Sequence, residues 1–213
     1  MRDSLSVREV RGDALIRLFT ALPEVIRRET GHDLLNTDPE TEMALLRGQH
    51  VLSKTLQIQA YLLLDTEETN DSLLTQENCL ARIALIRTDG QDEMCFGYFA
   101  KRDCLLYISP LLEAVERAAK ELGATCLIGP VNGSFWLSYR FKIDSFDLKP
   151  YFGEPRNPAD YPALFEAAGY RQANIYRSNY YPPGALVTKR MQDRLGRFQA
   201  LGYTIHTPRP REQ

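Results

Sequence analysis

The sequence has 213 residues, of which 44% are hydrophobic and 25% charged, and its formal net charge is -2. This length and composition are typical of a globular protein with one large domain or two small ones. A nearly neutral charge argues against a nucleic-acid-binding protein, and no apolar run approaches the roughly 20 residues that cross a bilayer. We therefore expect neither a nucleic-acid partner nor a membrane-spanning segment.

Cysteine spacing limits the covalent and metal chemistry. Cys79, Cys95, Cys104 and Cys126 lie far apart and form no Cys-x-x-Cys pair. Four scattered cysteines of this kind indicate neither a disulfide framework nor a zinc knuckle, so we predict no metal and four reduced cysteines in or near the core. The first residues lack the apolar core of a signal peptide, and we expect a cytoplasmic protein.

The first third of the chain predicts a strand followed by two helices. Leu5–Val10 alternates as a short strand does. Asp13 is placed to cap a helix that Pro23 breaks or kinks. Asp38 followed by Pro39 marks a second helix start, because proline at the first helical position loses no hydrogen bond.

Three strands are predicted next, at Leu56–Leu64, Leu80–Arg87 and Met94–Ala100. A long polar stretch, Asp65–Asn78, separates the first two and reads as an exposed loop. The Asp89-Gly90 pair between the second and third is a strong hairpin signal. The three strands should therefore form an antiparallel meander.

The best-defined element is a helix with Ser109 as its cap, Pro110 at its first position and Gly123 at its left-handed end. It leads into Thr125–Ile128, a short apolar run that we predict to be a buried strand. A helix that returns into a strand is a right-handed crossover, so this strand should lie parallel to an earlier one. The predicted class is α+β (mixed α/β), a largely antiparallel sheet with helices on both faces.

An irregular stretch with a loop at its start follows that strand, where ligands bind in open α/β sheets. In the loop, Asn132 and Ser134 can bond either local backbone or a ligand. Aromatic side chains that suit core filling or an apolar acyl or aromatic ligand come next. They are Trp136, Tyr139, Phe141, Phe146, Tyr151 and Phe152.

These motifs resemble the GNAT superfamily of acyltransferases over about Leu80–Ser178. The resemblance is carried by three segments around the long helix, and it is closest to a bacterial, uncharacterised branch of GNAT-like proteins. The segments are Phe96-Gly97-Tyr98-Phe99, Gly129-Pro130-x-Asn132-x-Ser134, and Pro155-x-Asn157-Pro158-x-x-Tyr161 with the later pair Gly169-Tyr170.

The resemblance implies a GNAT-like (acyl-CoA N-acyltransferase) fold as a single domain over residues 5–207, with a flexible tail over 208–213. In that fold the strands before and after the long helix splay apart, and the pantetheine arm of the donor pairs with the free strand edge. The implied donor-binding residues are Cys95, Gly97, Phe99, Asn132 and Ser134.

Two departures from the family pattern bear on the chemistry. The stretch Lys101–Ser109 has no glycine, whereas the family's glycine turn holds the coenzyme A pyrophosphate on backbone amides. The donor is therefore either acyl-coenzyme A or an acyl carrier protein thioester. Phe165 holds the position of the tyrosine that protonates the leaving thiolate. Tyr161, one turn earlier, either replaces that catalytic acid or only packs under the Asn157-Pro158 turn.

The resemblance implies an acyltransferase that moves an acyl group from a pantetheine thioester to an amine acceptor, on a small molecule or a protein. The alternative is a catalytically inactive GNAT-fold module that recognises an acyl or pantetheine ligand or a protein partner. A strand over Tyr170–Tyr180 and an amphipathic helix that includes Met191 and Phe198 complete the predicted elements.

Longer relatives in this branch carry a second lobe after this region, so we expect a second copy of this chain to cover the face left open. Phe198, Leu201, Tyr203 and Ile205 either form that contact or cover the domain's own sheet. In light scattering at micromolar concentration, a homodimer gives about twice the chain mass of 24.3 kDa. A mass near 24.3 kDa that does not change with concentration rules the dimer out.

Overall fold

The computed structural model describes residues 4–31, 34, 38–104, 108–151, 153–180, 182, 188–204 and 206. Contacts divide the chain into two units, Met1–Arg171 and Gln172–Gln213, and each is described by itself. A single domain over 5–207 accordingly stays a prediction.

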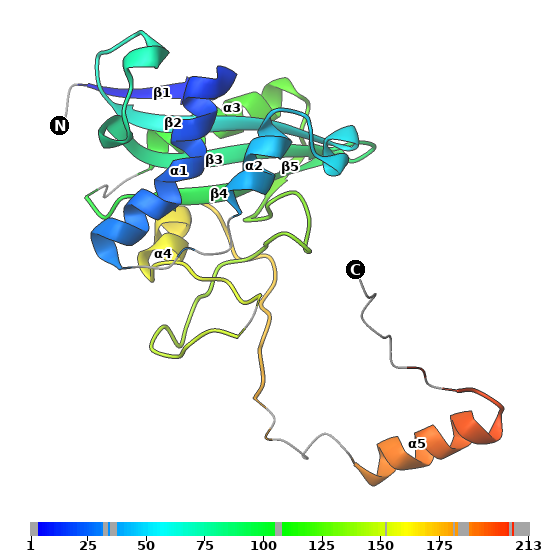
Figure 1. Cartoon of the computed structure of the whole chain (residues 1–213). Coiled ribbons are helices and arrows are strands. Elements are labelled where there is room, and N and C mark those ends of the chain that lie inside the picture. The colour runs from blue at the N-terminus through cyan, green and yellow to red at the C-terminus, as the bar shows by residue number, and fades with distance from the viewer. Residues whose placement is uncertain are drawn as a thin grey trace. The chain divides into compact units, whose positions relative to one another are not determined.

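The first unit is built on a five-stranded sheet whose strands lie in chain order (Figure 1). The strands are β1 (Leu5–Glu9), β2 (Leu56–Asp65), β3 (Cys79–Thr88), β4 (Glu93–Lys101) and β5 (Cys126–Ile128). The first four pair antiparallel, and β5 lies parallel to β4. The predicted class is confirmed: a mixed α+β protein with a largely antiparallel sheet that ends in one parallel pair.

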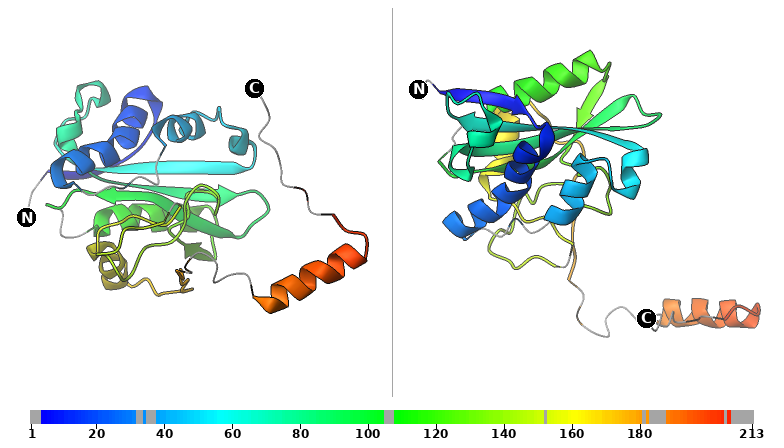
Figure 2. Two further views of the ribbon diagram at one scale, coloured as in Figure 1. Left: turned by 60° about the horizontal axis from the view of Figure 1, so that its bottom comes forward. Right: turned by 45° about the horizontal axis from the view of Figure 1, so that its top comes forward.

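Helices cover both faces of this sheet, as the left view of Figure 2 shows. Helices α1 (Gly12–Thr30) and α2 (Pro39–Leu46) pack on one face, and α3 (Ser109–Glu121) and α4 (Asp160–Ala167) on the other. Alternate residues of the central strands feed two separate cores, because successive side chains of a strand point to opposite faces. Short 3₁₀ helices follow α2 and fill the β2–β3 connection, at Val51–Lys54, Asp71–Leu73 and Gln76–Asn78.

The helix ends of the first unit match the predictions in part. Asp38 accepts a hydrogen bond from the Glu40 N–H at the start of α2, as predicted for a cap. The prediction that Asp13 caps α1 is wrong. The helix begins two residues earlier, at Gly12 after Arg11, so the Asp13 carboxylate lies inside the first turn, where it interacts favourably with the helix dipole. Pro23 does not end α1, which continues to Thr30.

The predictions for the ends of α3 are also confirmed only in part. Gly123 has the predicted left-handed conformation, with φ of +81°, and ends the helix. Ser109 is not the cap but the first helical residue, and Ile108 precedes it without a side-chain bond to the helix. Pro110 is therefore the second helical residue rather than the predicted first, and still lies in the first turn.

The prediction that the strand after α3 is buried is wrong. β5 is the last strand of the sheet and pairs with β4 alone, so Cys126 is exposed and Ile128 only half-buried. Its residues are apolar because the strand packs against α3 and α4 on one face of the sheet, and not because it lies in the middle of the sheet. Cys104 is exposed too, which leaves Cys79 buried and Cys95 half-buried among the four free thiols.

In the second unit, α5 (Lys189–Ala200) is capped by Thr188, which accepts a hydrogen bond from the Met191 N–H. The strand predicted over Tyr170–Tyr180 is wrong, because no residue of that stretch belongs to a strand. The apolar side chains of α5 and the residues after it are exposed, namely Met191, Leu195, Phe198, Leu201 and Tyr203. Ile205 lies outside the described residues. Among the residues described, no helix is long and apolar enough to cross a membrane.

Thiol labelling tests this burial pattern. Burial raises the pKa of the Cys79 thiol to about 12, so at neutral pH it stays protonated and unreactive as well as shielded. We expect Cys104 and Cys126 to react readily with an alkylating reagent in the folded protein, and Cys79 only after denaturation. Peptide mass spectrometry before and after unfolding measures this. Equal rates for Cys79 and Cys126 in the folded protein would contradict the fold.

Candidate functional site

The candidate site lies where β4 and β5 part. β5 pairs with β4 only along Glu93–Cys95, with Cys95 opposite Ile128. Beyond that point the following loop, not a strand, takes over the edge of β4: the Val131 N–H donates to the Phe96 carbonyl at 2.8 Å. The parallel pairing therefore ends at Cys95, and the loop continues along the β4 edge as far as Tyr98, so the splay implied for this pair stays a prediction.

β4 is bulged at this place. Its pairing with β3 shifts between Arg82 and Ala84, so Tyr98 and Phe99 together face a single residue of β3. Tyr98 has a φ of +54°, a left-handed conformation that is a genuine outlier for a bulky side chain. Bulges of this kind re-aim side chains and are frequent beside functional sites.

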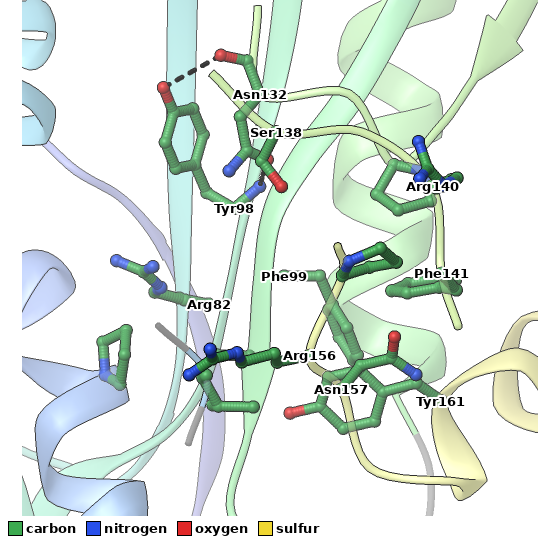
Figure 3. A pocket seen from close by; sticks show the side chains of 15 residues that line it. Arg82, Tyr98, Phe99, Asn132, Ser138, Arg140, Phe141, Arg156, Asn157 and Tyr161 are labelled. Atoms are coloured by element: carbon green, nitrogen blue, oxygen red, sulfur yellow. Dashed lines mark hydrogen bonds between the residues drawn. The ribbon is translucent and has the colours of Figure 1, made fainter. Parts of the chain in front are cut away.

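Asn132 holds the bulge in place (Figure 3). Its side-chain oxygen Oδ1 accepts the Tyr98 N–H at 2.7 Å, and its backbone carbonyl accepts the Tyr98 hydroxyl at 3.1 Å. The Asn132 N–H in turn donates to the Ser138 carbonyl at 2.8 Å. Asn132 is 8% exposed, so these bonds are shielded from water.

Two glycines permit the close approach of loop and strand. A Cβ atom on Gly97 would lie 2.4 Å from the Val131 carbonyl oxygen and 2.7 Å from Asn132 Oδ1. One on Gly129 would lie 2.5 Å from the Phe96 carbonyl oxygen. All three distances are shorter than real Cβ atoms show. Both positions therefore need glycine because a side chain would clash, and not because of the backbone dihedral angles.

Tyr161, on α4, contacts the edge of β4 at the end of the strand, at Lys101. Its hydroxyl accepts the Lys101 N–H at 3.0 Å, and the side chain is 1% exposed. Burial raises the pKa of this phenol, which therefore stays protonated at neutral pH. Lys101 is buried as well, and its Nζ pairs with Asp160 Oδ2 at 2.7 Å.

Asn157 and Asp160 do not cap α4. The residue before the helix is Ala159, which makes no side-chain cap bond. Asn157 instead bonds the backbone of Lys142 in both directions, accepting its N–H at 2.7 Å and donating to its carbonyl at 3.1 Å. These bonds attach the irregular segment to the start of α4.

A pocket of about 60 Å³ lies beside the bulge and brings three predicted site residues together: Phe99, Asn132 and Tyr161. Gly97 adjoins it through Asn132, whereas Cys95 and Ser134 are not among its described lining residues. The Ser134 hydroxyl accepts the Trp136 N–H at 3.2 Å, a local loop bond. The other described lining residues are Pro23, Leu34, Arg82, Tyr98, Ala100, Pro130, Ser138, Arg140, Phe141, Pro155, Arg156 and Asn157.

The aromatic residues after the loop do not converge on a ligand site, and that prediction is wrong. Trp136 is 95% exposed, and Phe146 and Tyr151 are exposed too, because they lie on loop segments outside the two cores. Of the six, Phe141 alone lines the pocket in the part of the chain that the structure describes, and it packs edge-on against Tyr161. Phe152 lies outside the described residues.

Sequence reasoning missed a buried ion pair beside the pocket. Arg82 on β3 and Glu42 on α2 are 1% and 3% exposed, and their atoms Nη1 and Oε2 lie 2.6 Å apart. Burial raises the pKa of the Glu42 carboxyl, against the opposing effect of the Arg82 charge. The available signal was a single charge, Arg82, in the otherwise apolar run Leu80–Ile86.

Comparison with known proteins adds little to this geometry. No protein-family model matches the sequence, and no curated protein matches it. Among solved structures the chain is similar to a tandem GNAT protein from the clavulanic acid biosynthesis pathway, solved without AcCoA. The match covers 77% of this chain and 42% of that one, with 12% identity and a TM-score of 0.46. This chain thus spans less than half of that protein's length, and a likeness this low carries no functional argument.

In the described residues, no group of three or more His, Cys, Asp or Glu side chains could hold a metal ion. The site consists of a bulged strand edge, two buried phenols and a small pocket that arginine side chains line.

Gly97→Ala tests the loop–strand contact. The added methyl group must displace the backbone at Val131, so we expect the free energy of unfolding to fall by about 1–3 kcal/mol. Gly196→Ala is the matched control, because nothing lies within 4 Å of its Cβ position on α5. That change should leave the free energy of unfolding unchanged or raise it by up to about 1 kcal/mol. Urea denaturation followed by circular dichroism measures both, and an unaltered Gly97→Ala protein would contradict the contact.

Proposed function

We propose that the chain transfers an acyl group from a pantetheine thioester to an amine, at the point where β4 and β5 part. The observation that carries this proposal is the parallel pair that ends at Cys95 beside a bulged strand, with Phe99, Asn132 and Tyr161 around one pocket. Ligands bind at such points in open α/β sheets. The strand order is also the one that the sequence resemblance to GNAT acyltransferases implies.

The donor would bind along the β4 edge. Two amides of this edge, those of Tyr98 and Lys101, already donate to side-chain oxygens, Asn132 Oδ1 and the Tyr161 hydroxyl. A pantetheine amide carbonyl offers the same kind of acceptor and can replace Asn132 at the Tyr98 N–H. The donor thus enters by displacing the Asn132 side chain, because a pocket of about 60 Å³ is too small to hold it otherwise.

The chemistry is direct transfer between two bound reactants. The amine nitrogen attacks the thioester carbonyl carbon, the new C–N bond forms, and the C–S bond breaks. A β4 amide polarises the carbonyl, a protonated Tyr161 gives its proton to the departing thiolate, and the proton that the attacking nitrogen loses restores the Tyr161 phenol. Holding the reactants in line lowers the barrier by several kcal/mol. The acceptor is an amine of a small molecule or a protein, and the donor is acyl-coenzyme A or an acyl carrier protein.

A second candidate is a catalytically inactive module that binds an acyl or pantetheine ligand or a protein partner. One observation favours it: the amides that a donor needs are occupied from within the chain. Phe165 also favours the inactive module. It occupies the position of the catalytic tyrosine of the GNAT family, yet it is a core residue that stacks on Phe96 with ring centroids 4.9 Å apart.

Titration calorimetry with acetyl-coenzyme A, a longer acyl-coenzyme A and an acylated carrier protein measures donor binding, and thiol release in the presence of amines measures transfer. Tyr161→Phe removes the acid and should lower kcat by about 100-fold while donor binding changes little. It also removes the acceptor of the Lys101 N–H, so circular dichroism must first show that the variant is folded. Tyr151→Phe, an exposed phenol outside the pocket, is the matched control and should change neither value.

Binding of a donor with no thiol release to any amine would favour the inactive module over the enzyme. No binding of any of the three donors would contradict the enzyme and the module that binds an acyl or pantetheine ligand, and would leave only the module that binds a protein partner. A Tyr161→Phe protein with the wild-type kcat would leave transfer intact but remove Tyr161 from its role as acid.

A further inference from the structure

The guanidinium of Arg82 has N–H donors for which no described residue is an acceptor. Nη1 donates to the Phe19 carbonyl at 2.9 Å and to Glu42 Oε2 at 2.6 Å, and Nη2 donates to Glu42 Oε1 at 3.2 Å. Arginine carries five N–H donors, so the Nε–H and one N–H of Nη2 remain. No described residue accepts a hydrogen bond from Nε, although the side chain is 1% exposed.

The two remaining donors lie side by side on one edge of the planar guanidinium. That edge forms a fork that matches the two oxygens of a carboxylate. A buried donor with no acceptor is unfavourable, so an acceptor from outside the chain is expected there. Arg82 lines the pocket beside the β4 bulge, which is where such an acceptor can enter (Figure 3).

The charges around the pocket favour an anion. Arg82, Arg140 and Arg156 line it, and the described lining contains no acidic side chain. Glu42 neutralises Arg82 from the α2 side, and Glu154 pairs with Arg140 at 3.0 Å. A ligand with a negative charge therefore meets three guanidinium groups and no carboxylate in the described lining of the pocket.

We propose that this pocket binds the carboxylate of a small molecule, with Arg82 Nε and Nη2 as its bidentate donors. The volume of about 60 Å³ limits the bound group to a carboxylate and a short stem. Asn132 and Tyr161 line the same pocket, so the rest of the molecule extends toward the β4 edge. As an extension that rests on the proposed function, the carboxylate belongs to the acceptor, which is then a small amino acid.

The Nε–H signal of Arg82 in a ¹⁵N-labelled sample of the full chain reports on this contact directly. We would titrate acetate, the common amino acids and inorganic phosphate, together with the carboxamide of each amino acid as its neutral counterpart. Carboxylates should shift the Arg82 Nε–H signal in a saturable manner, and the carboxamides should not.

Variants add an independent readout. Arg82→Lys keeps a cation for Glu42 but loses the two-pronged donor edge of the guanidinium. Because at least one charge-assisted hydrogen bond to the ligand is then lost, binding should weaken at least about tenfold. Arg156→Gln should weaken binding less, since it removes charge without the fork. Arg17→Gln removes a guanidinium from the exposed face of α1 and should leave affinity unchanged. Circular dichroism verifies folding, and the wild-type titration decides the question if Arg82→Lys does not fold.

Absence of a shift with every carboxylate would overturn the proposal and leave an ordered water as the acceptor. Equal shifts with carboxamides, or tighter binding of phosphate than of any carboxylate, would overturn it too. If carboxylates bind but no acyl transfer occurs, the pocket assignment stands and the proposed function fails. If transfer occurs equally well to amines without a carboxylate, the function stands and the acceptor assignment fails.

Discussion

The hydrogen bond from the Tyr98 N–H to Asn132 Oδ1 is the contact on which the rest of the site depends. It holds a bulky residue in a left-handed conformation, which keeps the β4 bulge and orients Phe99 toward α4. It also fixes the loop after β5 against the strand, where only glycine at position 97 leaves room. Without this bond, the bulged strand would have an unpaired buried amide and the pocket would lose one wall.

The fold was largely predictable from the sequence, because its elements carry strong local signals. The Asp89-Gly90 turn, the Asp38-Pro39 start and Gly123 each fix an element end by backbone chemistry. The position of β5 was not predictable. Its apolar side chains pack against α3 and α4 on one face, and an edge strand of this kind has the same composition as a central one.

The site was predictable only where sequence neighbours form it. Asn132 and Tyr161 were identified by their motifs, yet their observed partners are backbone amides of β4, which no side-chain pattern encodes. The Arg82–Glu42 pair joins residues 40 positions apart on a strand and a helix, so its geometry depends on how α2 packs on the sheet. The exposure of Trp136 and Tyr151 follows from the path of an irregular segment, which has no periodicity to read.

The only tryptophan of the chain, Trp136, is nearly fully exposed and lies four residues from Asn132 in the same loop. Its emission in the folded protein should therefore already resemble that of a solvated indole, and tryptophan fluorescence will report poorly on unfolding of the core. The same position makes it an intrinsic reporter for the loop. Any molecule that displaces Asn132 from β4 moves the backbone that carries this indole, and a change in its fluorescence would give the kinetics of that event without a label.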